Sequence, residues 1–214
     1  IRRVAATLDV PILEVAGWEA DDVIATLVKR ARSQGMATEI VTSDKDFLQL
    51  LAPDVSIYDP MKDVPIGAAD ARERFGVEPS QMREYQALVG DAIDNVPKVP
   101  GIGPKTAAEL VKRFGTVENL IAHVDEIEKP KLKQSIKENL EQLRRAYQLV
   151  SFRDDLEVEA DPSALGVRPI HKLEARALFT ELEFYRLINE MPAADATALT
   201  REATIVHDAA SLAA

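Results

Sequence analysis

The sequence predicts an α/β fold in which a partly parallel sheet covered by helices is followed by a helical region. Over the first sixty residues, short apolar runs typical of buried strands alternate with a helical pattern. Beyond them the alternation stops, and helical patterns are separated by Gly or Pro. The chain has 214 residues, 46% of them hydrophobic and 29% charged, which is enough for one sizeable core or two small ones.

The first region is expected to contain a β-α-β unit. Ile12 to Val15 and Thr38 to Thr42 are apolar runs typical of short strands, and Ala20 to Ser33 between them has apolar residues at helical spacing. A short helical segment, Asp46 to Leu51, then precedes a third apolar strand, Val55 to Tyr58. These connections favour parallel strands covered by helices.

The second region is expected to be helical throughout. Apolar residues recur at helical spacing in segments bounded by Gly or Pro, and the longest segment is highly charged outside one apolar stripe. The predicted helices are Ala68 to Phe75, Ser80 to Val89, Thr106 to Phe114, Val117 to His123, Lys131 to Leu149, Lys172 to Leu182 and Tyr185 to Glu190.

Charge is distributed unevenly along the chain. The formal net charge of −10 taken alone argues against binding to nucleic acid, because phosphates need clustered Lys and Arg. Residues 1–97 hold 10 basic and 17 acidic side chains and residues 146–214 hold 6 and 12, whereas residues 98–145 hold 10 and 7. An acidic first section could therefore hold metal ions and a basic middle section could hold phosphates.

Composition also limits the cellular setting. The sequence contains no cysteine, which excludes disulfides and thiolate metal sites and fits a reducing cytoplasm. No apolar run approaches the roughly 18 to 20 residues of a membrane span, and residues 1–8 lack the pattern of an export signal. We therefore expect a soluble, cytoplasmic protein.

Acidic residues gather at three places, each at the end of a predicted element. Each place also has an ordinary structural explanation. Acids in a first helical turn oppose the helix dipole, an Asp after a strand can cap the next helix, and Asp is common in turns. The clusters are Glu19, Asp21 and Asp22 at the start of the first helix, Asp44 and Asp46 after the second strand, and Asp91 and Asp94 in the turn from Gly90 to Asn95.

Taken together, the three clusters favour a metal site. Ligand sites in parallel α/β sheets lie beyond the carboxyl ends of the strands, where the first two clusters would project. Converging carboxylates repel one another unless cations neutralise them, and oxygen ligands suit Mg²⁺ or Mn²⁺. The histidines, His123, His171 and His207, are far apart in sequence and are not expected to be ligands. Two ions about 4 Å apart would activate a water and stabilise the leaving oxygen of a phosphodiester, which is nuclease chemistry.

A helix-hairpin-helix pattern joins the third acidic cluster to the helix at Thr106. The glycines permit close approach of the backbone, and exposed N–H groups at a helix start can bind a phosphate. Such contacts address the DNA backbone and do not read its sequence. A plain tight turn between two helices is the alternative. The candidate contact residues are Gly101, Ile102, Gly103, Lys105 and Thr106.

In this order and spacing the motifs resemble the 5′ nuclease (5′-3′ exonuclease) domain of bacterial DNA polymerase I, in the flap endonuclease superfamily. The resemblance extends over roughly Val10 to Glu190 and is specific in combination. The motifs that carry it are Glu19-Ala20-Asp21-Asp22, Val41-Thr42-Ser43-Asp44-Lys45-Asp46, Gly90-Asp91 with Asp94-Asn95, and Pro100-Gly101-Ile102-Gly103.

This resemblance implies a PIN-like (Rossmann-like) core, two Mg²⁺ or Mn²⁺ ions, and action on a 5′ flap or nicked duplex without sequence preference. It also implies that the hairpin grips the duplex, with K⁺ bound to its carbonyls, and we expect the protein to be a monomer. Carried over by position, the metal-site acids would be Glu19, Asp21, Asp22, Asp44, Asp46, Asp91 and Asp94.

The predicted domain organisation follows from the same resemblance. Residues 1–95 would form the C-terminal part of the nuclease core and residues 96–190 its helix-hairpin-helix region. Residues 191–202 would form a linker, and residues 203–214 would open the next polymerase domain. Family members begin with a strand that carries an Asp, and they have a basic helical arch; neither is found here. We therefore expect a piece of the nuclease, with an incomplete sheet and impaired activity.

The alternative hypothesis assigns the chain to a different functional class, in which the hairpin binds DNA but the acidic residues are not catalytic. In it the chain is a non-catalytic DNA-binding module, and the acidic clusters only cap helices and turns. Metal-dependent cleavage of a flapped duplex separates the two hypotheses.

Overall fold

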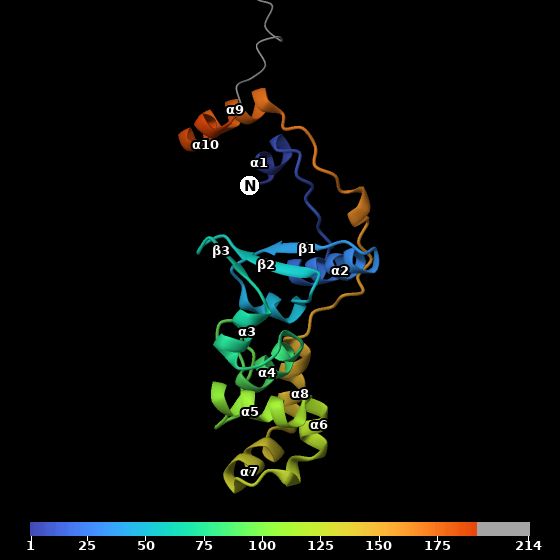
Figure 1. The fold of residues 1–214 in the computed structure, drawn as a ribbon, viewed down its shortest axis with the longest axis vertical. Helices are drawn as coiled ribbons and strands as arrows, with labels where there is room; N and C mark the ends of the chain where they lie inside the picture. The colour runs from blue at the N-terminus through green and yellow to red at the C-terminus, as the bar shows by residue number, and fades with distance from the viewer. Residues whose placement is uncertain (192–214) are drawn as a thin grey trace, which may run out of the picture. The chain divides into compact units, whose positions relative to one another are not determined.

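The computed structural model describes residues 1–191, shown as a ribbon in Figure 1. The predicted linker from residue 192 onward and the predicted domain start at 203–214 lie outside the described residues. The described chain forms two compact units: Leu13–Leu165, and Ile1–Ile12 together with the segment from Gly166 onward. Among residues 1–191, no helix has the length and apolarity needed to cross a lipid bilayer.

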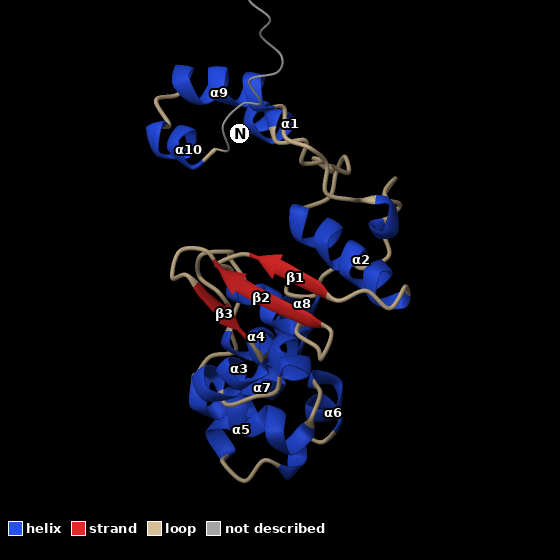
Figure 2. Cartoon of the chain, turned by 45° about the horizontal axis from the view of Figure 1, so that its top comes forward, coloured by secondary structure: helices blue, strands red, loops and turns tan. Residues whose placement is uncertain are grey.

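A three-stranded sheet of order β1-β2-β3 lies in the unit Leu13–Leu165 (Figure 2). β1 (Thr38–Val41) pairs in parallel with β2 (Val55–Asp59), with Ile40 opposite Ile57. The predicted parallel pair is thus confirmed. β3 (Val64–Ile66) adds an antiparallel edge that the sequence did not predict, because a three-residue strand with Pro65 at its centre has almost no alternation signal.

The predicted strand Ile12 to Val15 is wrong, and with it the β-α-β unit. Residues 11–15 form no strand, and the observed order is helix, strand, strand. Leu13 and Val15 are partly buried against a small cluster around Val23. Alternating apolar residues indicate that one side of a segment is buried. Here that side is buried against a cluster that includes Val23 of a helix, and not against a neighbouring strand.

Helix α2 (Ala20–Ser33) has the predicted bounds, and a later part of the chain is tied to it. The Arg30 guanidinium donates to the carbonyls of Leu156 (2.8 Å), Val158 (2.5 Å) and Ala160 (3.1 Å). Hydrogen bonds from a charged donor are stronger than neutral ones. The three Arg30 hydrogen bonds hold residues 156–160 against α2.

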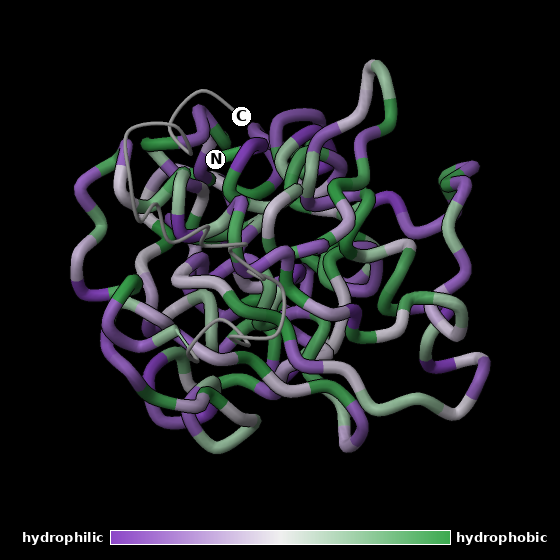
Figure 3. Tube along the Cα trace, turned by 90° about the horizontal axis from the view of Figure 1, so that it is seen from above, coloured by the Kyte–Doolittle hydropathy of each residue, from purple (hydrophilic) through white to green (hydrophobic). Residues whose placement is uncertain are grey.

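Helices that bury one face each make up the rest of this unit. Hydrophobic and hydrophilic residues alternate over short distances along the trace (Figure 3), as one-sided helices require. The segment predicted from Asp46 is a 3₁₀ helix, Lys45–Leu50. The α-helices are α3 (Ala68–Phe75), α4 (Met82–Val89), α5 (Pro104–Phe114), α6 (Val117–Ala122), α7 (Pro130–Glu138) and α8 (Leu140–Leu149).

The predicted helix Lys131 to Leu149 is two helices, because Asn139 leaves the helical conformation with φ −118° and ψ 24°. Its side-chain amide donates to the Ser135 carbonyl at 2.7 Å, which satisfies a carbonyl at the end of α7. The apolar stripe still packs inward on both sides of the break, since Ile136 and Leu143 are fully buried.

Three helices form the described part of the other unit: α1 (Arg2–Thr7), α9 (Lys172–Glu181) and α10 (Tyr185–Glu190). The Arg3 guanidinium makes two hydrogen bonds to the Glu181 carboxylate, at 2.9 and 2.7 Å, which joins α1 to α9. The sequence predicted α9 and α10 but not α1.

Candidate metal centre and nucleic-acid interface

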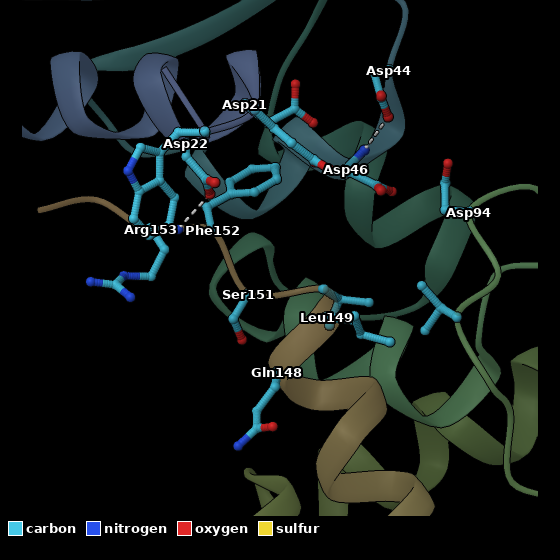
Figure 4. A pocket seen from close by; sticks show the side chains of 15 residues that line it. Asp21, Asp22, Asp44, Asp46, Asp94, Gln148, Leu149, Ser151, Phe152 and Arg153 are labelled. Carbon is cyan, nitrogen blue, oxygen red and sulfur yellow. Dashed lines mark hydrogen bonds between the residues drawn. The ribbon is translucent and has the colours of Figure 1, made fainter. Parts of the chain in front are cut away.

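A cleft of about 540 Å³ in the unit Leu13–Leu165 collects most of the predicted metal-site acids. Figure 4 shows the carboxylates of Asp21, Asp46 and Asp94 from three separate segments around this cleft. Acids distant in sequence have therefore been brought to one place by the fold. Those that line the cleft are Glu19, Asp21, Asp22, Asp44, Asp46 and Asp94.

The first cluster lies at the N-terminus of α2. Glu19 is the N-cap residue and makes no side-chain capping bond, and Asp21 and Asp22 follow in the first turn. The Asp22 carboxylate accepts a hydrogen bond of 2.8 Å from the backbone N–H of Arg153. The helix start thus serves two purposes, because acids that oppose the helix dipole also face the cleft.

The second cluster begins the 3₁₀ helix after β1. The Asp44 carboxylate accepts from the backbone N–H of Asp46 at 2.9 Å, so Asp44 is an N-cap as well as a cleft residue. One capping bond leaves most of the acceptor sites of a carboxylate available. The Asp46 carboxylate accepts a hydrogen bond from the side-chain amide of Gln86, a buried residue of α4.

The loop that carries Asp44 is held by a buried carboxylate that sequence reasoning missed. Asp59, at the end of β2, is 1% exposed and accepts from the Ser43 hydroxyl at 2.6 Å and from the Lys62 ammonium at 2.9 Å. These bonds, that of Lys62 first, hold the pKa of Asp59 well below its usual range. Asp59 therefore remains ionised and fixes the residue next to Asp44.

The third cluster divides. Asp94 is exposed and lines the cleft, whereas Asp91 lines a smaller neighbouring cavity of about 100 Å³. The Asp91 carboxylate pairs with the Lys45 ammonium and accepts the backbone N–H of Ile93 at 2.8 Å. The Lys45 hydrogen bond, above all, lowers the pKa of Asp91. Asp91 thus does not line the cleft itself, but it shares the neighbouring cavity with Asp46.

Burial and neighbouring negative charges raise the pKa of two cleft carboxylates. Burial, followed by the charge of Asp44, raises the pKa of Asp46 to about 6. Burial, followed by the charges of Asp44 and Glu19, also raises the pKa of Asp21. Carboxylates that share a partly desolvated site without a cation carry this cost, and a bound cation removes it.

The donor set suits hard divalent cations. All six cleft donors are carboxylates, and Mg²⁺ is usually held by one or two carboxylates with water completing its coordination. Within residues 1–191, no group of three or more Asp, Glu, His or Cys side chains is arranged to hold one ion by itself. A set of carboxylates around an open cleft suits divalent ions that keep several of their waters.

Replacing Asp46 with Asn is expected to raise the melting temperature in EDTA at pH 7.5 by about 2–4 °C for each kcal/mol of repulsion removed, and to have little effect at pH 4. The stabilising contribution of neutral Asp46 is present below its unfolded pKa and is lost as pH rises through about 6. Thermal unfolding across this pH range measures the effect. The same gain at both pH values would show that charge is not its cause.

The hairpin between α4 and α5 exposes its backbone. A Cβ built on Gly101 or Gly103 meets no atom within 4 Å, and Gly101 has φ +79°. Ile102 between them is buried at 5% exposure and donates its N–H to the Val99 carbonyl at 3.1 Å. Lys105, in the first turn of α5, is exposed, and Thr106 beside it is partly buried. The loop leads into the N-terminus of α5, and the phosphate contact at this place stays a prediction.

Two family models match the chain: the 5′-3′ exonuclease N-terminal resolvase-like domain over residues 1–76, and the 5′-3′ exonuclease C-terminal SAM fold over residues 77–173. The chain belongs to the 5′-3′ exonuclease family. The two models meet at residues 76 and 77, and the predicted boundary at 95 and 96 stays a prediction.

The relatives that the chain matches include a DNA polymerase I and a shorter 5′-3′ exonuclease. The chain is 39% identical over 208 residues to DNA polymerase I of Rhizobium leguminosarum, matching 97% of this chain and 20% of that protein. It is 35% identical over 193 residues to the 5′-3′ exonuclease of Aquifex aeolicus, matching 89% of this chain and 65% of that protein. The chain thus spans about a fifth of the polymerase and about two thirds of the exonuclease.

Solved structures share the fold. A mutant of the T5 5′-exonuclease superimposes with a TM-score of 0.61 and 28% identity, covering 65% of this chain and 57% of that one. A bacteriophage T5 flap endonuclease in a pseudo-enzyme-product complex with DNA and metal ions has a TM-score of 0.57 and 25% identity, covering 82% and 60%. The α/β core followed by a helical region is therefore confirmed for this exonuclease family member.

Sequence reasoning assigned no role to several residues that contact the acids or line the cleft. Gln86 contacts Asp46, and Lys45 pairs with Asp91. Trp18 and Arg153 also line the cleft. Trp18 directly precedes Glu19, so its position gave a signal, but Gln86 and Arg153 reach the cleft only through the fold.

Proposed function

We propose that the chain is a metal-dependent 5′-3′ exonuclease and 5′-flap endonuclease domain of the DNA polymerase I type, which hydrolyses DNA phosphodiesters in primer removal and repair. One observation carries the proposal: six carboxylates from three separate segments line a single cleft. The T5 5′-exonuclease with bound zinc and the T5 flap endonuclease with DNA and metal ions support it.

In this proposal the cleft carboxylates bind the metal ions, and neighbouring groups orient the carboxylates. The six cleft carboxylates would hold two Mg²⁺ or Mn²⁺ ions, which when bound supply Lewis acidity and an activated water. Gln86 donates to Asp46 and so fixes the orientation of that carboxylate. The backbone N–H of Arg153 does the same for Asp22. Fixed carboxylates reduce the reorganisation that the reaction requires.

Asp91 has a supporting role in this proposal. Its carboxylate pairs with Lys45. Its backbone N–H donates to the Val96 carbonyl at 3.0 Å and its carbonyl accepts from the Val96 N–H at 2.7 Å, which closes the turn. The turn carries Asp94 to the cleft. Asp91 remains close to the site, so bound ions could draw it away from Lys45.

The hairpin would hold duplex DNA by its backbone, with K⁺ on its carbonyls, and the protein would act as a monomer. Two contacts tie the hairpin to α7 and α8: the Ser135 hydroxyl donates to the Pro100 carbonyl at 2.6 Å, and the Gln142 amide donates to the Lys98 carbonyl at 2.7 Å. Neither contact fills the space beside the two hairpin glycines.

Replacing Lys105 with Ala is expected to reduce the slope of log affinity for duplex DNA against log salt by about one unit, because one phosphate contact is lost. Gly103→Val is expected to weaken binding to flapped and plain duplex alike. Gly103 has φ −110°, which side chains adopt without backbone strain, and an added Cβ meets no protein atom within 4 Å. Fluorescence anisotropy in Ca²⁺ measures both effects. An unchanged slope and unchanged affinities would mean that the hairpin is only a turn.

The experiment that tests the function is cleavage of a 5′-flap duplex by the complete protein in Mg²⁺, with the matched 3′-flap duplex and an EDTA reaction as controls. Cleavage near the junction of the 5′ flap alone, and only with metal, is expected. The non-catalytic alternative draws support from Asp44, which caps a helix, and it predicts DNA binding without cleavage under every condition.

A further inference from the structure

One side of the acidic cleft has a different chemistry from the rest. Trp18, Leu149 and Arg153 line the cleft beside the carboxylates, and we call these three residues the aromatic rim. Trp18 is 43% exposed and Leu149 is 63% exposed. Trp18 and Leu149 are therefore apolar surface in contact with water, next to the place where the chemistry is proposed.

The rim is held in place from several directions. The Arg153 guanidinium lies 5.1 Å from the centre of the Trp18 ring, and its Nε donates to the Asp155 carboxylate at 3.0 Å. The neighbouring Phe152 anchors this segment, since its ring packs against the buried Phe47 at 5.3 Å. Figure 4 shows Phe152 and Arg153 pointing in different directions from this segment. The indole is thus presented on a fixed support.

The apolar residues of the rim, Trp18 and Leu149, lie outside the two apolar clusters of the described chain. Arg153 is the only cation among the residues that line the cleft, all of which the structure describes. The Trp18 ring suits a ligand with a flat apolar face. Arg153, together with metal ions held by the six carboxylates, suits a ligand that carries negative charge.

We propose that Trp18 stacks on an unpaired nucleobase of the DNA strand next to the phosphodiester being cut, with Arg153 covering the opposite face of the indole and facing that strand's phosphates. The proposal rests on the nuclease function proposed above. Every base has a flat π-face, and aromatic rings and guanidinium planes are the groups that bind splayed-out bases. Stacking of this kind adds affinity for single-stranded or frayed nucleotides without reading their sequence.

Trp18 is the only tryptophan of the chain, so its fluorescence reports on the rim directly. The complete protein is titrated, in Ca²⁺ to limit hydrolysis, with a 5′-flap duplex that carries a dye far from the junction. If the complete protein contains further tryptophans, these are replaced with Phe. We expect Trp18 fluorescence to be quenched over the same concentrations at which dye anisotropy rises.

Abasic nucleotides placed one at a time around the junction locate the stacked base. At one position the abasic substitution is expected to abolish most of the quenching and to weaken binding about ten-fold. Anisotropy that rises without quenching, or quenching that no abasic position changes, would overturn the stacking proposal and leave the nuclease function intact. Absence of both DNA binding and cleavage would overturn the function, and the stacking with it.

Variants give a second readout. Trp18→Ala is expected to lose about ten-fold in affinity for the intact flap but little for the flap with the critical abasic nucleotide. Trp18→Tyr, which keeps an aromatic face, is expected to restore most of the loss. Met61→Ala, at a residue 83% exposed and outside the cleft, is the matched control and is expected to bind like the parent protein. Equal losses for Trp18→Ala on intact and abasic DNA would contradict stacking.

Discussion

Replacing both Asp44 and Asp46 with Asn is expected to reduce 5′-flap cleavage by about a thousand-fold or more while duplex affinity stays within about two-fold. Both carboxylates line the acidic cleft, and metal-ion stabilisation of a transition state is worth several kcal/mol. The hairpin that would bind the duplex lies in another part of the unit, between α4 and α5. Catalysis and binding should therefore separate.

The matched control removes the same charge elsewhere. Glu157 and Glu159 are exposed and do not line the cleft, so Glu157→Gln with Glu159→Gln tests the effect of net charge alone. Single-turnover cleavage and anisotropy binding are measured for both double variants. A loss of DNA affinity as large as the loss of rate would remove Asp44 and Asp46 from the metal site.

Helices could be predicted from the sequence where their signals are local. Ala20–Ser33, Ala68–Phe75 and Tyr185–Glu190 have the bounds that periodicity and end signals predict. Each begins or ends beside residues that favour such a boundary, as Gly35 does with φ +73° and Gly76 with φ +73°. Local backbone preference and one-sided burial agree in these segments.

Elements that depend on partners could not be predicted in the same way. Ile12 to Val15 has the alternation of a strand but packs on a helix, and Val64–Ile66 is a strand only because β2 lies beside it. The break at Asn139 depends on its own side-chain bond to Ser135. In the first two cases tertiary contacts decide the structure, and at Asn139 a local side-chain bond ends the helix.

In the candidate site, too, some features have local sequence signals and others depend on contacts made by the fold. Residue type and element ends predicted a convergence of carboxylates, and six of the seven line one cleft. Asp91 differs because Lys45, 46 residues earlier, reaches its carboxylate. No spacing rule could have predicted that pair, or the contact from Gln86 to Asp46.

Gly90→Ala is expected to lower the melting temperature by about 5–10 °C, through both backbone strain and collision. Gly90 has φ +69° and ψ 177°, a conformation that is almost confined to glycine. A Cβ there would lie 2.7 Å from the Val96 carbonyl oxygen and 2.8 Å from the Lys98 backbone nitrogen. Because both neighbours are backbone atoms, no side-chain rotation relieves the contact.

The backbone that Gly90→Ala would displace connects the proposed metal site to the proposed DNA-binding hairpin. Residues 91–98 carry Asp94 to the cleft and lead into the hairpin, and the Val99 N–H donates to the Leu88 carbonyl at 3.4 Å across this closure. Gly90→Ala should therefore reduce cleavage and DNA binding together, unlike the Asp44 and Asp46 variant. Gly35→Ala is the matched control, since Gly35 has φ +73° but no atom within 4 Å of the added Cβ. If both glycine variants lose the same stability and Gly90→Ala binds DNA normally, the close approach at Gly90 does not hold the acidic turn and the hairpin together.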